Sequence, residues 1–150
     1  MNDDKLDIII SELLSVLPMF QKKLIKPNVE HDEYKFNHTH IQVLRILDEY
    51  GSCAISDVSK KLFISMPNMT KILNKLIDEG MINRAHDNKD RRVINISLTP
   101  KGDEYLKRKF MIVKESIRDR ISDLDDSQID VFASSLTSLK NILTQIKIDE

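Results

Sequence analysis

Residues 62–98 constrain the fold of this chain most, because a short helix with clear start and stop signals precedes a charged hairpin. Ser65 suits the N-cap, since a serine hydroxyl can accept a hydrogen bond from the first turn. Pro67 fits that first turn, where its missing N–H costs little, and Gly80 predicts a left-handed C-terminal cap. Apolar residues between these signals recur at helical spacing and define one face: Met69, Ile72, Leu73, Leu76 and Ile77.

The remaining surface of this predicted helix is polar and carries Asn68, Thr70, Lys71, Asn74 and Lys75. A compact helix with amides and lysines on its outer face is typical of an element that enters the major groove of DNA. We expect Asn68, Thr70 and Lys71 to reach base edges. Ser65 and Lys75 are expected to lie nearer to the phosphates.

A hairpin follows this helix directly. Residues 81–85 form one strand candidate, and in the second, at 93–98, apolar residues alternate with other side chains. The loop between them, residues 86–92, is too highly charged to be buried, and its Asp and Asn residues favour turns. A helix followed by a hairpin with a basic tip is the pattern of a winged helix-turn-helix fold.

Several features around the hairpin occur together: Arg84, an Asp-x-Arg pair at Asp90 and Arg92, and a Leu-Thr-x-x-Gly sequence at residues 98–102. They follow a helix that ends in Glu-Gly-Met-Ile, and in this combination they resemble the wing of the MarR family of bacterial regulators. The resemblance extends over nearly the whole chain. It implies a mainly α fold with a small β-hairpin wing, with long N- and C-terminal helices that dimerise. The implied function is dimeric, DNA-binding transcription regulation.

The hairpin tip is the second expected DNA contact. An arginine at such a tip, Arg91 or Arg92, can enter the narrow minor groove, where the negative potential is strongest. In the family, the aspartate of the Asp-x-Arg pair orients the arginine. The pair corresponds to Asp90 and Arg92 in this chain. The alternative is a solvated loop whose ion pairs contribute little. The residues of the hairpin expected at DNA are Arg84, Lys89, Asp90, Arg91 and Arg92.

The distribution of charge supports a DNA partner more than the net charge does. The net charge is only −1, but residues 60–101 hold nine Lys or Arg and four acidic residues. This segment therefore carries +5, and the rest of the chain carries −6. A basic centre on an acidic frame is the pattern expected of one face that meets a polyanion. The alternative is ordinary surface charge.

Other classes of protein find little support. We see no Gly-rich phosphate loop, nucleophile elbow or paired catalytic carboxylates, so we expect neither an enzyme nor a cofactor. The single cysteine, Cys53, excludes a disulfide framework within the chain. Asp3, Asp4 and Asp7 oppose a signal peptide or membrane span at the N-terminus, which favours a cytoplasmic protein.

A metal-sensing regulator is one alternative that stays open. Residues 30–40 are rich in metal-ligand types, namely Glu30, His31, Asp32, His38 and His40. Zinc-sensing members of the family combine ligands near this loop with histidines on the helix after the wing. Residues 101–122 contain no histidine, so we expect no metal site. A second alternative is a winged-helix protein-interaction module that has lost DNA binding, although such a module has no need of a basic wing.

Both ends of the chain predict amphipathic helices. The first, residues 6–25, contains Pro18, which predicts a kink or a break. The last follows a heptad spacing from residue 129 to 146. We expect a homodimer held by these helices, although packing within one chain is the alternative. The expected interface residues are Leu6, Ile9, Phe132, Leu136, Leu139, Leu143 and Ile146.

These expectations combine into one domain, residues 1–150, with a DNA-binding lobe at about 39–98 and dimerisation helices at about 4–26 and 99–148. The expected function is a repressor that binds near-palindromic operators and is relieved by a small-molecule ligand. The ligand would be aromatic or amphipathic, because the expected lining is mostly apolar. This lining comprises Leu13, Leu17, Phe20, Ile41, Leu44 and Phe110, with His38 and His40 at the rim. For any single one of these residues, a place in the core is the simpler interpretation.

Overall fold

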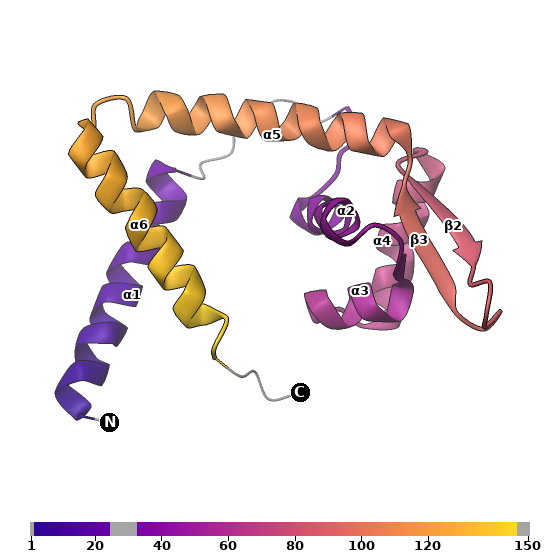
Figure 1. Ribbon diagram of the computed structural model, residues 1–150, viewed down its shortest axis with the longest axis horizontal. Helices are drawn as coiled ribbons and strands as arrows, with labels where there is room; N and C mark the ends of the chain where they lie inside the picture. Colours follow the sequence, from indigo (N-terminus) through magenta and orange to yellow (C-terminus); the bar gives the residue numbers. More distant parts are fainter. Residues whose placement is uncertain (1, 25–32, 147–150) are drawn as a thin grey trace. The chain divides into compact units, whose positions relative to one another are not determined.

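A computed structural model describes residues 2–24 and 33–146 and shows a mostly helical chain with a small antiparallel sheet (Figure 1). This confirms the predicted winged-helix architecture. In chain order the elements are α1 (Asp3–Lys23), α2 (His38–Tyr50), β1 (Cys53–Ala54), α3 (Ile55–Leu62), α4 (Met66–Asp78), β2 (Ile82–His86), β3 (Ile94–Leu98), α5 (Pro100–Arg120) and α6 (Asp126–Leu143).

The chain divides into two compact units. We call residues 28–113 the winged unit, since they contain α2, α3, α4, the sheet and the first part of α5. The terminal unit comprises residues 1–27 and 114–150 and contains α1, α6 and the rest of α5. Each unit is described by itself below.

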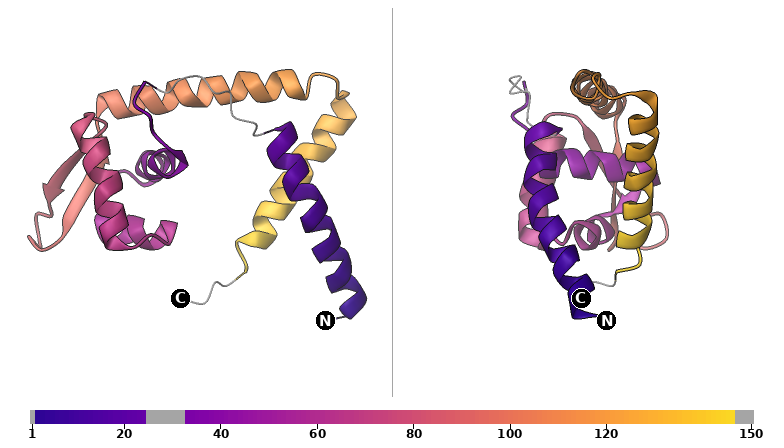
Figure 2. Two further views of the ribbon diagram at one scale, coloured as in Figure 1. Left: turned by 180° about the vertical axis from the view of Figure 1, so that it is seen from behind. Right: turned by 90° about the vertical axis from the view of Figure 1, so that its left-hand side faces the viewer.

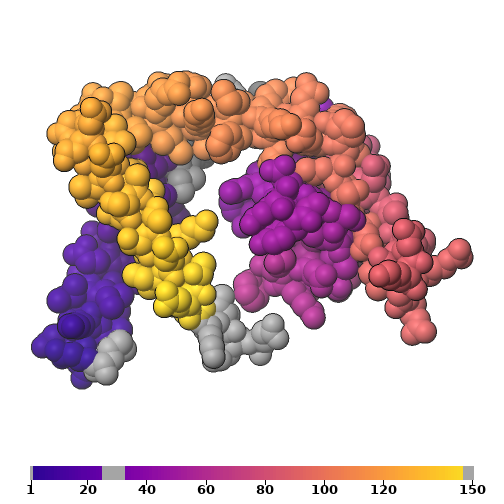
Figure 3. Space-filling view, viewed as in Figure 1, coloured from indigo at the N-terminus to yellow at the C-terminus, as the bar shows by residue number. Residues whose placement is uncertain are grey.

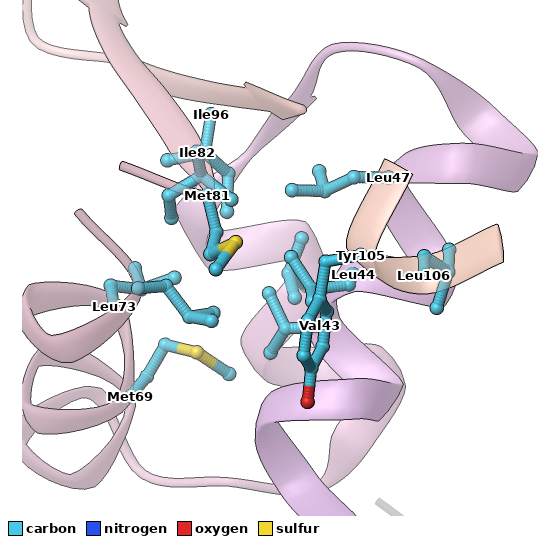
Figure 4. Packing of buried hydrophobic residues seen from close by; sticks show 12 residues of the cluster. Val43, Leu44, Leu47, Met69, Leu73, Met81, Ile82, Ile96, Tyr105 and Leu106 are labelled. Carbon is cyan, nitrogen blue, oxygen red and sulfur yellow. The ribbon is translucent and has the colours of Figure 1, made fainter. Parts of the chain in front are cut away.

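The core of the winged unit joins α2, α4, the sheet and the start of α5 (Figure 4). Tyr105 of α5 lies against this core and makes edge-to-face contacts with Tyr34 and Phe36, at centroid distances of 5.5 and 5.4 Å. Burying each large apolar side chain contributes about 1.5–3 kcal/mol. The buried apolar residues are Val43, Leu44, Leu47, Val58, Met69, Leu73, Leu76, Met81, Ile82, Ile96, Tyr105 and Leu106.

The three strands are ordered β1-β3-β2 and all pairs are antiparallel. In the hairpin, Ile82 pairs with Leu98 and His86 pairs with Ile94. Ile96 in the central strand is fully buried, whereas β2 is exposed beyond Ile82. The alternation predicted for the second strand thus places its central isoleucine in the core, and the far end of the hairpin extends beyond the core.

Helix α4 begins and ends close to the predicted residues. Gly80 has a φ of +72°, and the amide of Met81 donates to the carbonyl of Leu76 at 2.8 Å, which confirms the left-handed cap. Ser65 is the N-cap, but its hydroxyl makes no capping hydrogen bond, so that part of the prediction is wrong. Pro67 lies in the first turn, as expected.

The start of α2 is closed by a capping box that buries His40, which differs from the exposed position expected for this residue. Asn37 is the N-cap residue, and its side chain accepts from the amide of His40 at 3.2 Å. The ring of His40 accepts from the amide of Asn37 in return, and it stacks on Phe36. His40 is therefore only 6% exposed, and its expected place at the rim of a pocket is wrong.

In the terminal unit, α1 runs without interruption from Asp3 to Lys23, although Pro18 lies inside it. The break that we considered does not occur. A proline removes one backbone hydrogen bond, and a long amphipathic helix can absorb that loss. Neither α1 nor α6 contains a buried residue, so their apolar faces are exposed in this chain.

Gly102 provides a test of how closely α5 packs on the winged unit. A Cβ atom at this position would overlap with the carbonyl oxygen of Met81, which accepts from the amide of Thr99 at 3.0 Å. We predict that Gly102→Ala lowers the free energy of unfolding by about 2–4 kcal/mol, because backbone must shift.

The matched control is Gly80→Ala. This glycine has a φ of +72° in the left-handed cap, and the nearest atom to its Cβ position is the side-chain Cδ of Lys101 at an ordinary 3.8 Å, so only backbone strain, about 1–2 kcal/mol, is expected. Urea denaturation of both variants measures the difference. Equal effects would contradict the close approach of α5.

Candidate nucleic-acid interface

Helix α4 presents its polar face to solvent because its apolar face is buried. Met69, Leu73 and Leu76 lie in the core, and this fixes the rotation of the helix about its axis. Asn68, Thr70, Lys71 and Asn74 are accordingly exposed. The structure thus brings the residues expected at base edges onto one accessible surface.

Two polar residues of α4 have partners within the chain. The hydroxyl of Thr70 donates to the carbonyl of Met66 at 2.9 Å, so only its acceptor capacity remains for a base. Lys75 is half-buried, donates to the carbonyl of Lys35 at 2.6 Å and lies over the ring of Phe36. Sequence reasoning placed Lys75 near phosphates, whereas the structure shows it fastening the segment before α2.

The tip of the hairpin is held by its own hydrogen bonds. The amide of Asp87 donates to the carbonyl of Val93 at 2.9 Å, and the amide of Val93 donates to the backbone carbonyl of Asp90 at 3.0 Å. The ring of His86 lies 2.9 Å from the carbonyl of Arg91. The hairpin is the outermost part of the winged unit, as the views from front and back show (Figures 2 and 3).

Asp87 organises this tip, a role that sequence reasoning missed. Its carboxylate accepts from the amides of Lys89 and Asp90, at 2.9 and 3.1 Å, and from the side-chain amide of Asn95 at 2.9 Å. These bonds, led by that from Lys89, lower the pKa of Asp87. The available signal was the Asp-Asn-Lys-Asp sequence, since an aspartate often bonds amides two residues on in a turn.

Asp90 holds the backbone of Arg92 more closely than its guanidinium. The carboxylate accepts from the Arg92 amide at 3.0 Å, whereas the distance from its oxygen to Arg92 Nε is 4.0 Å. The side chain of Arg92 is 96% exposed. The Asp-x-Arg pair therefore sets the direction in which Arg92 leaves the backbone and leaves its guanidinium free in solvent. Arg84, Lys89 and Arg91 are also exposed.

The residues expected around an effector lie in two different units. Leu44 and His40 are buried in the winged unit, and Leu44 is a core residue without exposed surface. Leu13, Leu17 and Phe20 belong to α1 of the terminal unit. The remaining ones are the half-buried Ile41, the exposed His38 and the exposed Phe110 of α5.

Metal and membrane features were searched over the described residues. Within residues 2–24 and 33–146, no group of three or more His, Cys, Asp or Glu side chains is placed to hold a metal ion. Glu30, His31 and Asp32 lie outside the described residues. In the same part of the chain, no helix is both long and apolar enough to span a membrane.

Known proteins match this chain in sequence and in structure. The sequence model described as "MarR family" matches residues 36–94. The HTH-type transcriptional repressor MdtR of Bacillus subtilis (strain 168) is 34% identical over 100 residues, which cover 65% of this chain and 63% of MdtR. The matched region thus spans less than two thirds of MdtR.

Two solved structures share the fold over most of their length. Streptococcus pneumoniae FabT, crystallised in complex with DNA, gives a TM-score of 0.64 at 22% identity and covers 97% of this chain and 100% of its own. Bordetella bronchiseptica BpsR, whose DNA binding is regulated by 6-hydroxynicotinic acid, gives a TM-score of 0.63 at 19% identity, with 87% and 98% covered. At these identities both matches support the fold alone.

The fold defines a winged helix-turn-helix protein, in which α3 and α4 form the helix-turn-helix and the β2–β3 hairpin is the wing. Within that class, residues 36–94 match the sequence model of the MarR family, and the relatives that match in sequence are named as HTH-type transcriptional regulators. The resemblance seen in the sequence is confirmed.

Arg92 tests the wing. Replacing Arg92 with alanine is expected to weaken DNA binding about 5- to 150-fold without changing stability, because its guanidinium is free to meet the DNA. Fluorescence anisotropy with a labelled duplex measures the affinity. The control is Arg45→Ala, which removes an exposed arginine of α2 and should leave affinity nearly unchanged. Equal affinities of the Arg92 variant and the parent would contradict the assignment.

Asp87 tests the order of the wing. Asp87→Ala is expected to weaken DNA binding by about three- to tenfold, because the loop must be ordered again on binding. Since the pKa of Asp87 is lowered, its bonds persist above the ordinary carboxyl pKa of about 3.9 and are lost only as pH falls through the lower folded value. Near pH 7 the parent thus retains these bonds and the variant lacks them, so hydrogen exchange at the amides of Lys89 and Asp90 should be faster in the variant. Unchanged exchange would show that other bonds suffice.

Proposed function

We propose that this chain is a homodimeric, sequence-specific DNA-binding repressor of transcription that acts in the cytoplasm. The observation that carries the proposal is the exposure of the polar face of α4 and of a basic wing on one compact unit. An α-helix fits the major groove, and arginines at a hairpin tip fit the minor groove beside it. Both sites belong to the same unit, so one duplex can meet both.

The division of roles follows from the chemistry of each side chain. Asn68 and Lys71 are exposed and keep their donors, so they are the proposed base contacts, with Thr70 as an acceptor. Ser65 lies at the N-terminal end of α4, where free amides also favour a phosphate. Arg84, Lys89, Arg91 and Arg92 supply the wing contacts.

The proposed dimer rests on apolar surface that the terminal unit leaves uncovered. The heptad stripe is exposed at Leu136, Leu139 and Leu143 in α6 and at Ile146 just after it, and α1 exposes Ile9. Contiguous apolar surface of this kind marks a protein–protein interface. A two-fold dimer would bring two recognition helices about one DNA turn apart, or a multiple of it, and requires a near-palindromic operator.

Regulation by a small aromatic or amphipathic ligand is also part of the proposal. The DNA binding of BpsR, which shares this fold, is regulated by 6-hydroxynicotinic acid. This supports an effector of similar chemistry for the present chain. A ligand can shift operator affinity only by its differential affinity for two states, typically ~1–3 kcal/mol. Thermal-shift screening of aromatic acids and phenols, followed by operator binding, is the test. No active compound would argue against an effector of this class.

A mobility-shift assay tests the function itself. The probe is the duplex upstream of the chain's own coding sequence, and the full chain is the protein. Affinity should fall steeply between ~50 and ~200 mM salt, since phosphate contacts release counterions. A promoter fragment of unrelated sequence and equal length is the control. Equal binding to both, or no binding at low salt, would favour an interaction module without operator recognition.

The dimer is tested by one charge in the α6 stripe. Leu139→Glu should convert the dimer to a monomer, because a carboxylate would have to be buried at the interface. Ser138→Glu adds the same charge on another face of α6 and should leave the dimer intact. Deletion of residues 127–150 should also give a monomer or an insoluble chain. Light scattering measures the mass, and a dimeric Leu139→Glu protein would contradict the interface.

A further inference from the structure

The turn between α3 and α4 holds an exposed aromatic residue in a strained conformation. Phe63 has a φ of +53° and is 69% exposed. The amide of Ile64 donates to the carbonyl of Ser59 at 3.0 Å, which closes the end of α3 around Phe63. This position favours glycine, because a side chain at positive φ costs free energy. The ring of Phe63 is not buried and its backbone is strained, so packing within the winged unit does not explain a phenylalanine at this position.

The first residues of α4 extend the same apolar surface. Met66, the first residue of the helix, is 49% exposed, and Pro67 after it is exposed too. The hydroxyl of the buried Ser59 lies 3.3 Å from the sulfur of Met66, so α3 positions this side chain. Sequence reasoning expected polar base contacts at this end of the helix. The residues expected to make those contacts begin at Asn68, and the two helical residues before it, Met66 and Pro67, are apolar.

Charge around this apolar end identifies its partner. From residue 58 to 77 the chain has four lysines and no acidic residue. Lys60 and Lys61 lie in the last turn of α3, three and two residues before Phe63, and Lys71 is exposed on α4. An apolar spot on a segment whose charged residues are all lysines is complementary to a polyanion that offers apolar groups between its charges. DNA has this character in its major groove.

The major groove presents one protruding apolar group, the C5-methyl of thymine. Apart from the small C5–H of cytosine, the groups that the bases present there are donors or acceptors, and covering one of these with an apolar side chain leaves it without its hydrogen bond to water. We propose that Phe63 and Met66 recognise thymine C5-methyl groups and so determine thymine positions in each operator half-site. This inference rests on the proposed function, since it concerns the same DNA surface.

The test compares thymine with uracil, which lacks only the methyl group. The full chain selects its preferred sequence from duplexes with a randomised centre, and the best duplex is remade with deoxyuridine at one thymidine position at a time. At one or two positions of each half-site, the parent should bind about fourfold more weakly per methyl lost, the factor expected for one buried methylene-sized group.

Variants then link the loss to the two side chains. Phe63→Gly removes the ring and relaxes the turn, because glycine adopts positive φ freely, so the fold should be retained and its melting temperature not lowered. In Phe63→Gly and Met66→Ala, the ratio of thymine to uracil affinity should approach one at the positions concerned. Lys71→Ala is the matched control, which should weaken both duplexes equally and leave the ratio unchanged.

The outcomes separate this inference from the proposed function. Discrimination by the parent that is lost in Phe63→Gly or Met66→Ala supports methyl recognition. Tight, selective DNA binding with equal affinity for thymine and uracil overturns it and leaves the proposed function standing. Discrimination that persists in both variants also overturns it, because other residues then contact the methyl groups. Failure to select any sequence overturns both.

Discussion

Burial of the apolar stripe of α4 is the interaction on which the rest of the winged unit depends. Met69, Leu73 and Leu76 are almost fully removed from water, which contributes about 1.5–3 kcal/mol for each large side chain. This burial fixes the rotation of α4, so the side chains between the buried ones must point outward. Met81 and Ile96 belong to the same core, so it also fixes where the hairpin leaves the unit. One core therefore sets both proposed DNA contacts.

The wing depends on a second, smaller set of interactions. Its tip lies beyond the core, where hydrophobic burial cannot hold it, and its order comes from hydrogen bonds to Asp87 and Asp90. Acidic side chains in a basic wing thus have a structural purpose, because they satisfy backbone amides and direct Arg92 outward. Phe63 and the apolar faces of α1 and α6 are costs to the isolated chain. In the proposed complex, DNA would cover Phe63, and a second chain would cover the apolar faces of α1 and α6.

Much of the fold could be predicted because its signals are local. The apolar spacing of α4, the stop at Gly80 and the charged loop of the hairpin each depend on neighbours within a few residues. The family resemblance came from the same segment, since Asp90, Arg92 and the residues after the wing adjoin in sequence. The polar face of α4 was predictable for the same reason, because helical periodicity assigns faces without knowledge of the partner.

What the sequence by itself determined was therefore the kind of each element, its approximate ends and the face it buries. Only the tertiary structure decided the partners: Lys75 with the carbonyl of Lys35, Asp87 with Asn95, and His40 buried at the cap of α2. It also decided that an aromatic residue, Phe63, stands exposed in a left-handed turn. Periodicity constrains which side of a helix is apolar, but side-chain partners depend on how separate elements pack, and that is fixed by the whole core.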